Sequence, residues 1–296
     1  MTPFAIAGVQ MHVTYDRENI SMMKAKVYHL MGTFPWVQMV VFSELAAYGP
    51  LRRNHPVSLE AAEREFKNLA RQHGIWLIPG SMFCAHEGRW HNMACVINPE
   101  GEIIGRYNKM FPFAPYEQGI EGGTEFLVFD VPGAGRFGLS ICYDMWFPET
   151  TRTLTAMGAE VLLCPVLTTT VDRDVELSMT RATAAMFQCY VFDINGLGAG
   201  GCGQSCVVGP SGTVLFQAKG QEQLIPLEID FDSVRRQRAV GTLGLGQTLK
   251  SFRDRRVDFS VYDRKRFDTG YLHGLGKLEL PARGSRAGLA DVKHID

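Results

Sequence analysis

The chain has 296 residues, of which 46% are hydrophobic and 21% charged, and its formal net charge is −1. This length and composition are typical of a globular protein with one large core or at most two domains. The nearly balanced charge gives no electrostatic reason to expect binding to nucleic acid or to an anionic membrane surface.

Neither a membrane anchor nor a metal-dependent site is expected from the sequence. No apolar run approaches the roughly 18 residues of a membrane-spanning helix, and the first residues have the pattern of a strand, not of a signal peptide. The cysteines are odd in number and form no Cys-x-x-Cys pair, so neither a zinc site nor a disulfide framework is expected. These features predict a cytoplasmic protein that uses no metal and no cofactor. The seven cysteines are Cys84, Cys95, Cys142, Cys164, Cys189, Cys202 and Cys206.

Strands and helices alternate along most of the chain. Near-continuous apolar runs predict buried strands, spacings of three and four predict helices, and Gly-Pro-Asn turns predict hairpins. Because no Pro/Ser-rich linker divides the chain, the pattern predicts one α/β domain with layered sheets covered by helices. The predicted strands are 4–13, 36–42, 75–83, 93–97, 102–107, 137–141, 159–165, 190–195, 207–215 (a hairpin) and 224–229, and the predicted helices are 17–30, 58–73, 173–188 and 231–238.

The character of the chain changes after about residue 248. Basic clusters such as Phe252-Arg253-Asp254-Arg255-Arg256 appear, and the apolar periodicity fades. From Pro281 onward the composition is typical of a flexible segment. We therefore expect a catalytic domain over residues 1–262 and a C-terminal extension over 263–296. The extension is either a solvated tail or an arm that wraps a partner subunit.

Three predicted strands end at residues suited to chemistry. The first strand of this kind ends at Glu44, the second at Lys109 and the third at Cys142. A charged group at the apolar boundary costs free energy unless it is paired, and such positions are enriched at functional sites. Pro148 and Glu149 predict a helix start soon after Cys142. We expect that helix N-terminus to lower the pKa of the thiol and to favour a nucleophile.

Each of these residues lies in a longer motif. The motifs are Phe42-Ser43-Glu44-Leu45, Tyr107-Asn108-Lys109, and Gly138-Leu139-Ser140-Ile141-Cys142-Tyr143-Asp144 with Phe147-Pro148-Glu149. Together they resemble the nitrilase superfamily of carbon–nitrogen hydrolases, in its amidase and N-carbamoyl-amide branches. The resemblance runs from Phe4 to about Tyr262. It implies a four-layer αββα sandwich, usually paired through helices near the nucleophile, so a homodimer or higher homo-oligomer is expected.

The resemblance also implies catalytic roles. Cys142 would be the nucleophile and Glu44 the general base that takes its proton. Lys109 would stabilise the oxyanion together with the backbone N–H of Tyr143. In the amidase branch a glutamate after the lysine positions the amide nitrogen or the incoming water; here this is Glu117, with Glu121 as the alternative.

The substrate class follows from the residues after the nucleophile. The pair Tyr143-Asp144 is similar to amidases and carbamoylases, where nitrilases tend to have Trp-Glu. The expected reaction is hydrolysis of a small amide or N-carbamoyl amine through a thioester, with release of ammonia or an amine. The sequence does not choose between the two substrates. Expected pocket residues are Tyr48, Tyr116, Tyr143, Trp146 and Thr168.

Three alternative functions are weighed against this one. The chain could act on a nitrile, or it could be a catalytically silent binding member of the same fold. The segment Gly138-x-Ser140-x-Cys142 is also close to the Gly-x-Ser-x-Gly turn of serine hydrolases. That enzyme would need a downstream histidine, and only His273 and His294, both in the weakly patterned tail, are available.

Overall fold

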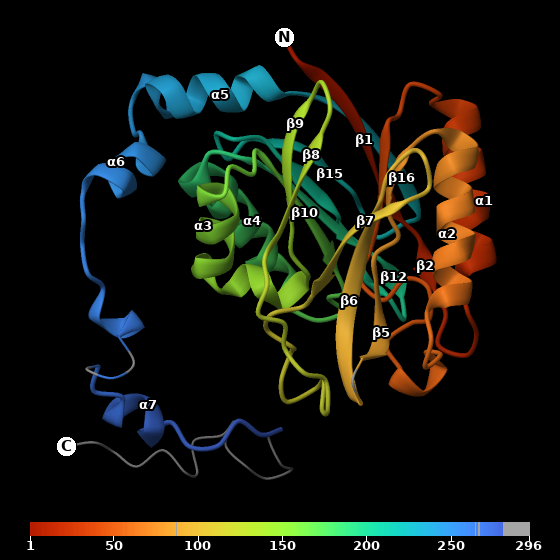
Figure 1. The fold of residues 1–296 in the computed structure, drawn as a ribbon, viewed down its shortest axis with the longest axis horizontal. Helices are drawn as coiled ribbons and strands as arrows, with labels where there is room; N and C mark the ends of the chain where they lie inside the picture. Colours follow the sequence, from red (N-terminus) through yellow and green to blue (C-terminus); the bar gives the residue numbers. More distant parts are fainter. Residues whose placement is uncertain (87, 264, 266, 281–296) are drawn as a thin grey trace.

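Figure 1 shows two β-sheets stacked between two pairs of helices. The computed structural model describes residues 1–86, 88–263, 265 and 267–280. The first sheet runs in the order β16-β1-β3-β4-β6-β5, and β7 pairs with β6. Its strands are β1 (Pro3–Gln10), β3 (Met39–Phe42), β4 (Trp76–Ile78), β5 (Ser81–His86), β6 (Arg89–Ile97), β7 (Ile103–Asn108) and β16 (Gln223–Asp230).

The second sheet runs in the order β15-β14-β11-β10-β9-β8. Within it β9, β10 and β11 are parallel, so their carboxyl ends meet at one edge of the sheet. A small third sheet joins β2 (His12–Val13), β12 (Leu197–Gly198) and β13 (Gly201–Cys202). The strands of the second sheet are β8 (Leu127–Val131), β9 (Gly135–Leu139), β10 (Val161–Val166), β11 (Tyr190–Asn195), β14 (Cys206–Val208) and β15 (Val214–Gln217).

The layering follows from strands that are apolar on both faces. In β3, Val41 belongs to the core cluster shared with the second sheet, whereas Val40 and Phe42 belong to the cluster beneath α1 and α2. A strand covered on both sides needs such a continuous apolar run. The predicted four-layer αββα sandwich is therefore confirmed. The covering helices are α1 (Ile20–Thr33) and α2 (Glu60–His73) on the first sheet, and α3 (Pro148–Ala156) and α4 (Arg173–Phe187) on the second.

The predicted strand over 75–83 is in fact two strands, β4 and β5, separated by Pro79 and Gly80. Gly80 has a φ of +78°, and a Cβ at this position would overlap the carbonyl oxygen of Ser43. Only glycine lets the chain pass this close to Ser43 without strain. The break therefore places β5 directly beside the residue that precedes Glu44.

After β16 the chain leaves the sandwich along one side of the molecule (Figure 1). The segment makes specific contacts with the second-sheet helices: Thr248 Oγ1 donates to the Met186 carbonyl at 2.6 Å, and Tyr262 Oη donates to Glu149 at 2.9 Å. The first helix here, α5 (Phe231–Val240), was predicted over 231–238, whereas the sequence pattern did not predict the two short helices that follow it, α6 and α7. The stretch from residue 281, expected to be flexible, lies outside the described residues. The remaining helices are α5 (Phe231–Val240), α6 (Thr248–Asp254) and α7 (Gly270–Gly274), with 3₁₀ turns η1 (Arg52–Asn54), η2 (Cys142–Trp146), η3 (Thr242–Gly244) and η4 (Ser260–Tyr262).

Candidate active site

The structure brings two of the three strand-end residues into direct contact. Glu44 follows β3 and Lys109 follows β7, and the Lys109 Nζ lies 2.8 Å from Glu44 Oε1. The side chains are 3% and 1% exposed, so this ion pair is almost fully withdrawn from water. Removing one partner of a buried pair leaves an uncompensated charge, which is strongly unfavourable. Lys109 and Glu44 are therefore expected to hold each other in place.

Glu117 joins this pair, whereas Glu121 does not. Glu117 Oε2 lies 2.8 Å from Lys109 Nζ, and it also accepts a hydrogen bond from the Phe113 backbone N–H. Glu121 is half exposed and pairs with Arg89 instead. Of the two glutamates that the sequence offered, only Glu117 shares the lysine.

Asn92, which sequence reasoning missed, bridges the two carboxylates. Its Nδ2 donates to Glu44 Oε1 at 2.8 Å and to Glu117 Oε1 at 2.9 Å. The Asn92 backbone carbonyl also accepts from the Lys109 N–H at 2.8 Å, which ties β6 to the end of β7. Asn92 is fully buried, and buried polar groups are usually hydrogen-bonded. The available signal in the sequence was a polar residue directly before the apolar run 93–97.

The charges in the cluster shift one another's pKa values. Burial raises the pKa of the Glu44 carboxyl, and the nearby Lys109 ammonium opposes this rise only in part. For Lys109, burial lowers the pKa, but the charges of Glu44, Cys142 and Glu117 outweigh burial and raise it. Lys109 therefore stays cationic, while Glu44 is easier to protonate than an ordinary glutamate.

Cys142 lies at a sharp turn after β9. Its φ of +46° is in the left-handed region, which is unfavourable for a residue with a Cβ and common at functional sites. The thiol is 8% exposed, and its Sγ lies 3.8 Å from the Leu167 carbonyl oxygen. The turn continues as η2, and α3 begins only at Pro148, the predicted first helical position.

The expected lowering of the thiol pKa does not occur. Burial raises the pKa of Cys142 well above its ordinary value; Glu44 raises it further, and Lys109 opposes. The expectation was wrong because burial, the largest effect, disfavours the thiolate. In addition, η2 separates Cys142 from the N-terminus of α3, and the charge effect of a helix end fades within one turn. At neutral pH the resting group is thus a thiol that needs a base.

Asp144 fixes the turn that carries Cys142. Its Oδ2 accepts from the Ile141 N–H at 2.9 Å and from the Tyr107 hydroxyl at 2.7 Å, and its Oδ1 accepts from the Phe111 N–H at 2.8 Å. Tyr107 and Phe111 flank Lys109, so one carboxylate connects the cysteine turn to the lysine segment. The sequence motif contained Asp144 but did not reveal this role.

A cavity of about 420 Å³ lies above Cys142. Four of the five expected pocket residues line it, namely Tyr116, Tyr143, Trp146 and Thr168. The fifth, Tyr48, lies outside this lining, because its ring packs in the core 5.2 Å from the ring of His55. The lining also includes residues that the sequence did not single out: Phe113, Leu167, Thr169, Thr170, Asp172 and Glu176.

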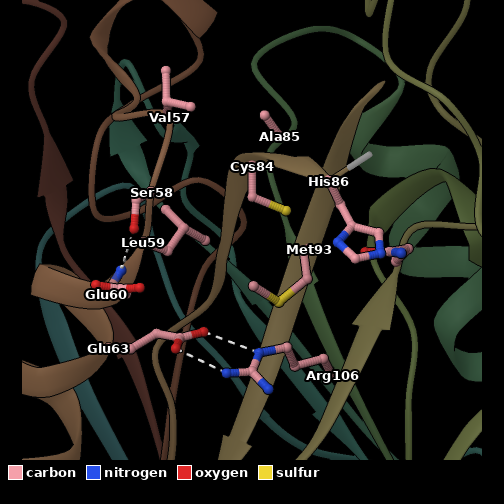
Figure 2. Close-up of a pocket in the computed structure, with 11 residues that line it drawn as sticks. Val57, Ser58, Leu59, Glu60, Glu63, Cys84, Ala85, His86, Met93 and Arg106 are labelled. Carbon is pink, nitrogen blue, oxygen red and sulfur yellow. Dashed lines mark hydrogen bonds and ion pairs between the residues drawn. The ribbon is translucent and has the colours of Figure 1, made fainter. Parts of the chain in front are cut away.

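Two further cavities have different linings. Figure 2 shows one of about 490 Å³ between the start of α2 and strands β5 to β7, where Glu63 pairs with Arg106. Its cysteine, Cys84, has a pKa raised to about 11 by burial. The nearby Glu63 has both carboxylate oxygens bound to Arg106, so it is a poor base for this thiol. The other, of about 530 Å³, is lined by Arg52, Arg53 and Glu117 among others.

Several features from the alternative functions can also be placed. Ser140 is buried within the strand-end segment, and His273 lies in α7, at the far end of the C-terminal segment in Figure 1; His294 lies outside the described residues. Among the described residues, no group of three His, Cys, Asp or Glu side chains could hold a metal ion. In the same part of the chain, no helix is long and apolar enough to cross a membrane.

Comparison with known proteins decides the family. The model of the carbon–nitrogen hydrolase family matches residues 5–239. The chain belongs to the carbon–nitrogen hydrolase family. This confirms the resemblance seen in the sequence.

Curated relatives of this carbon–nitrogen hydrolase include amidases. The 2-oxoglutaramate amidase of Bacillus subtilis is 30% identical over 57% of this chain and 68% of its own length. An (R)-stereoselective amidase of Pseudomonas is 33% identical over 51% of this chain and 56% of its own length. The matches thus span about half to two thirds of these relatives.

Solved structures show the same fold. A carbon–nitrogen hydrolase from Helicobacter pylori aligns with a TM-score of 0.77 and 24% identity, over 90% of this chain and 99% of that one. Nit3 of Saccharomyces cerevisiae, a member of branch 10 of the nitrilase superfamily, aligns with a TM-score of 0.74 and 22% identity, over 83% and 97%. At this identity the likeness establishes the fold alone.

Proposed function

We propose that this carbon–nitrogen hydrolase cleaves the C–N bond of a small amide or N-carbamoyl amine through a thioester at Cys142. The observation that carries the proposal is the pairing of a protonated thiol with a buried base. The pKa of Cys142 is raised by burial and by Glu44, so the thiol needs proton removal, and the pKa of Glu44 is raised toward the range of an effective general base. The amidases among the relatives support the choice of an amide.

In the first half of the reaction, Glu44 takes the proton of Cys142 as Sγ attacks the carbonyl carbon. Negative charge then develops on the carbonyl oxygen, where the Lys109 ammonium and the Tyr143 N–H stabilise it. A fixed donor in such a site typically contributes about 3–4 kcal/mol. The intermediate collapses as Glu44 returns the proton to the leaving nitrogen, and ammonia or an amine departs.

In the second half, water replaces the amine. Glu44 takes a proton from the water, which attacks the thioester carbon, and the thiolate leaves and is reprotonated. Glu117 would orient the amide nitrogen and later the water, because Lys109 and Asn92 hold its carboxylate beside Glu44. Apart from the substrate and the attacking water, these steps use only protein groups that are already in place in the resting site.

Matched variants test these roles. Cys142→Ala should abolish ammonia release from small amides and remove the acyl adduct seen by mass spectrometry of the intact protein. Glu117→Ala should lower kcat at least about 100-fold, whereas Glu121→Ala, which removes a carboxylate from the same loop, should leave kcat within about threefold. Wild-type turnover in Cys142→Ala would refute the proposal. A silent binding protein would show neither ammonia nor adduct.

A nitrile substrate is the nearest alternative chemistry. Ammonia release from an amide and from the nitrile of the same acyl chain separates the two, and we expect turnover of the amide only. The Tyr143-Asp144 pair supports this preference.

We also propose a cytoplasmic homodimer or higher homo-oligomer, with residues 1–262 as the catalytic domain. The C-terminal segment projects from the sandwich and exposes large apolar side chains, which supports an arm that contacts a second subunit (Figure 1). Analytical sedimentation of the full chain and of a chain ending at residue 262 tests this. If the arm contacts a second subunit, the oligomer of the shortened chain should have the larger dissociation constant. The exposed apolar side chains that the shortened chain lacks include Tyr271, Leu272, Leu275, Leu278 and Leu280.

A further inference from the structure

The cavity above Cys142 has acidic side chains but no basic ones among its described lining residues. Asp172 and Glu176 contribute carboxylates, and threonines contribute hydroxyls. The Lys109 ammonium lies nearby but is 1% exposed and held by two carboxylates. The remaining lining residues are Cys142, Leu167 and four residues with aromatic rings. These rings belong to Phe113, Tyr116, Tyr143 and Trp146.

Glu176 is the buried member of this acidic pair. It lies in the first turn of α4, and its side chain is 4% exposed. Its Oε2 accepts from the Thr168 hydroxyl at 2.6 Å and from Arg173 Nη1 at 3.2 Å. Its Oε1 has one long contact, from Trp146 Nε1 at 3.4 Å. A carboxylate has about four lone-pair sites, so Oε1 retains capacity for another donor.

The neighbouring arginine does not neutralise Glu176. Arg173 is shared with the fully buried Asp193, which it contacts through Nη2 at 2.8 Å and Nη1 at 3.2 Å. When both carboxylates are ionised, one guanidinium beside them leaves one net negative charge at the cavity wall. Burial and Asp193 raise the pKa of Glu176, and a bound cation would oppose this rise. Glu176 is also close enough to Cys142 to raise the pKa of its thiol. The uncompensated charge is therefore within the site of the reaction.

A buried negative charge and aromatic faces favour a cation. Ring faces attract ammonium and guanidinium groups, and the attraction grows when the cation loses its water. A substrate carboxylate in the same place would face two carboxylates without a basic partner, which is strongly unfavourable. The residues that line this cavity thus favour a cationic substrate group over an anionic one.

We propose that Glu176 is a specificity-determining residue that binds a cationic group, such as an alkylammonium, on the amide substrate. This inference rests on the proposed amide hydrolysis and names the class of substrate for that site. The cation can belong to the acyl chain or to the leaving amine, since both extend from the carbonyl carbon attacked by Cys142. The separate cavity that contains Arg52 and Arg53 shares only Tyr116 with this one among the described lining residues, and it offers the opposite charge.

Isosteric substrates test the proposal. 5-Aminopentanamide, hexanamide and glutaramate present a cationic, a neutral and an anionic end on acyl chains of similar length. An N-carbamoyl diamine and an N-carbamoyl alkylamine of equal length test the leaving-group side. We expect kcat/KM for the cationic member of at least one pair to exceed that for the neutral member by about tenfold or more. A preference for the neutral amide or for glutaramate would overturn the proposal, and in the anionic case it would point to the cavity with the arginines.

The Glu176→Gln variant separates recognition from support of the fold. It should lower kcat/KM for the preferred cationic substrate about 10- to 100-fold, mainly through KM, and change hexanamide turnover less than about threefold. Equal losses for both substrates would show a structural role only. Glu228→Gln, at an exposed position of β16, makes the same change in net charge and should alter neither.

A binding measurement distinguishes failure of this proposal from failure of the proposed function. If no amide or carbamoyl amine is hydrolysed, the hydrolase function itself fails. Calorimetry with pentylammonium then still decides the charge preference: binding to the wild-type chain that is lost in Glu176→Gln supports the cation site. Equal or absent binding in both proteins overturns it.

Discussion

Replacement of Asp144 by asparagine should loosen the connection between the nucleophile and the lysine. Asp144 accepts three hydrogen bonds, from the N–H groups of Ile141 and Phe111 and from the Tyr107 hydroxyl. Asparagine offers one oxygen and one NH₂ group in the same space. If the NH₂ replaces Oδ1, the Phe111 N–H faces another donor; if it replaces Oδ2, the Ile141 N–H does.

The cost can be worked from these contacts. A buried donor left without an acceptor costs about 1–3 kcal/mol, and the remaining bonds lose their charge-assisted strength. Burial raises the pKa of Asp144, so part of the cost is offset because a buried carboxylate is removed. We expect Asp144→Asn to lower the free energy of unfolding by about 2 kcal/mol and Tm by about 3–6 °C. Since the Cys142 turn also loses its fixed position, kcat should fall at least about tenfold.

Thermal unfolding and amide turnover measured on the same preparation check this prediction. Tyr107→Phe is the control, because it removes one donor and leaves both backbone N–H groups with their acceptors. Its cost should be about 1 kcal/mol. The reasoning is wrong if Asp144→Asn keeps the wild-type Tm, or if Tyr107→Phe is the more damaging of the two.

Two further predictions concern charge. Asn92→Leu removes donors that stabilise the ionised form of Glu44, so the acid limb of the pH profile of kcat/KM should move to higher pH by up to about one unit; an unmoved limb would contradict the assigned contacts. Burial lowers the pKa of His55 to about 4, so the unfolded chain binds more protons than the folded one between pH 6.5 and pH 4, and stability falls as pH falls through that window. Urea unfolding at pH 7 and pH 5 should show the wild type losing about 2 kcal/mol more than His55→Gln; equal losses would exclude His55 as the source.

Elements with strong local patterns could be predicted from the sequence. The strand predicted over 190–195 and the helix predicted to start at Arg173 both appear in the structure. They could be predicted because a continuous apolar run and an amphipathic spacing are visible within a short stretch of sequence. The ends of apolar runs likewise pointed to Glu44, Lys109 and Cys142. A polar or reactive residue directly after an apolar run can be recognised from the sequence alone, without knowledge of which residues contact it in the fold.

What the sequence could not supply depended on contacts between distant segments. Glu117 and Glu121 lie in one loop, and only the fold shows that Lys109 reaches the first while Arg89 takes the second. Glu176 occurs in a helix where a glutamate is usually solvated, so no local pattern distinguishes it. The pKa of Cys142 was mispredicted for a related reason, because its burial outweighs any effect of the following helix.

The site depends on the stacking of the two sheets as much as on any one motif. Glu44 and Lys109 follow strands of the first sheet, whereas Cys142 follows β9 of the second. The Glu44 N–H donates to the Val166 carbonyl at 3.2 Å, so the end of β3 is bonded directly to the end of β10. This bond and the contacts of Asp144 with Tyr107 and Phe111 both connect the first sheet to the second. A shift of one sheet over the other would therefore move Glu44 away from the Cys142 thiol, although neither residue had changed. The continuous core between the sheets prevents this shift, so it is needed to hold residues that lie far apart in the sequence at one site.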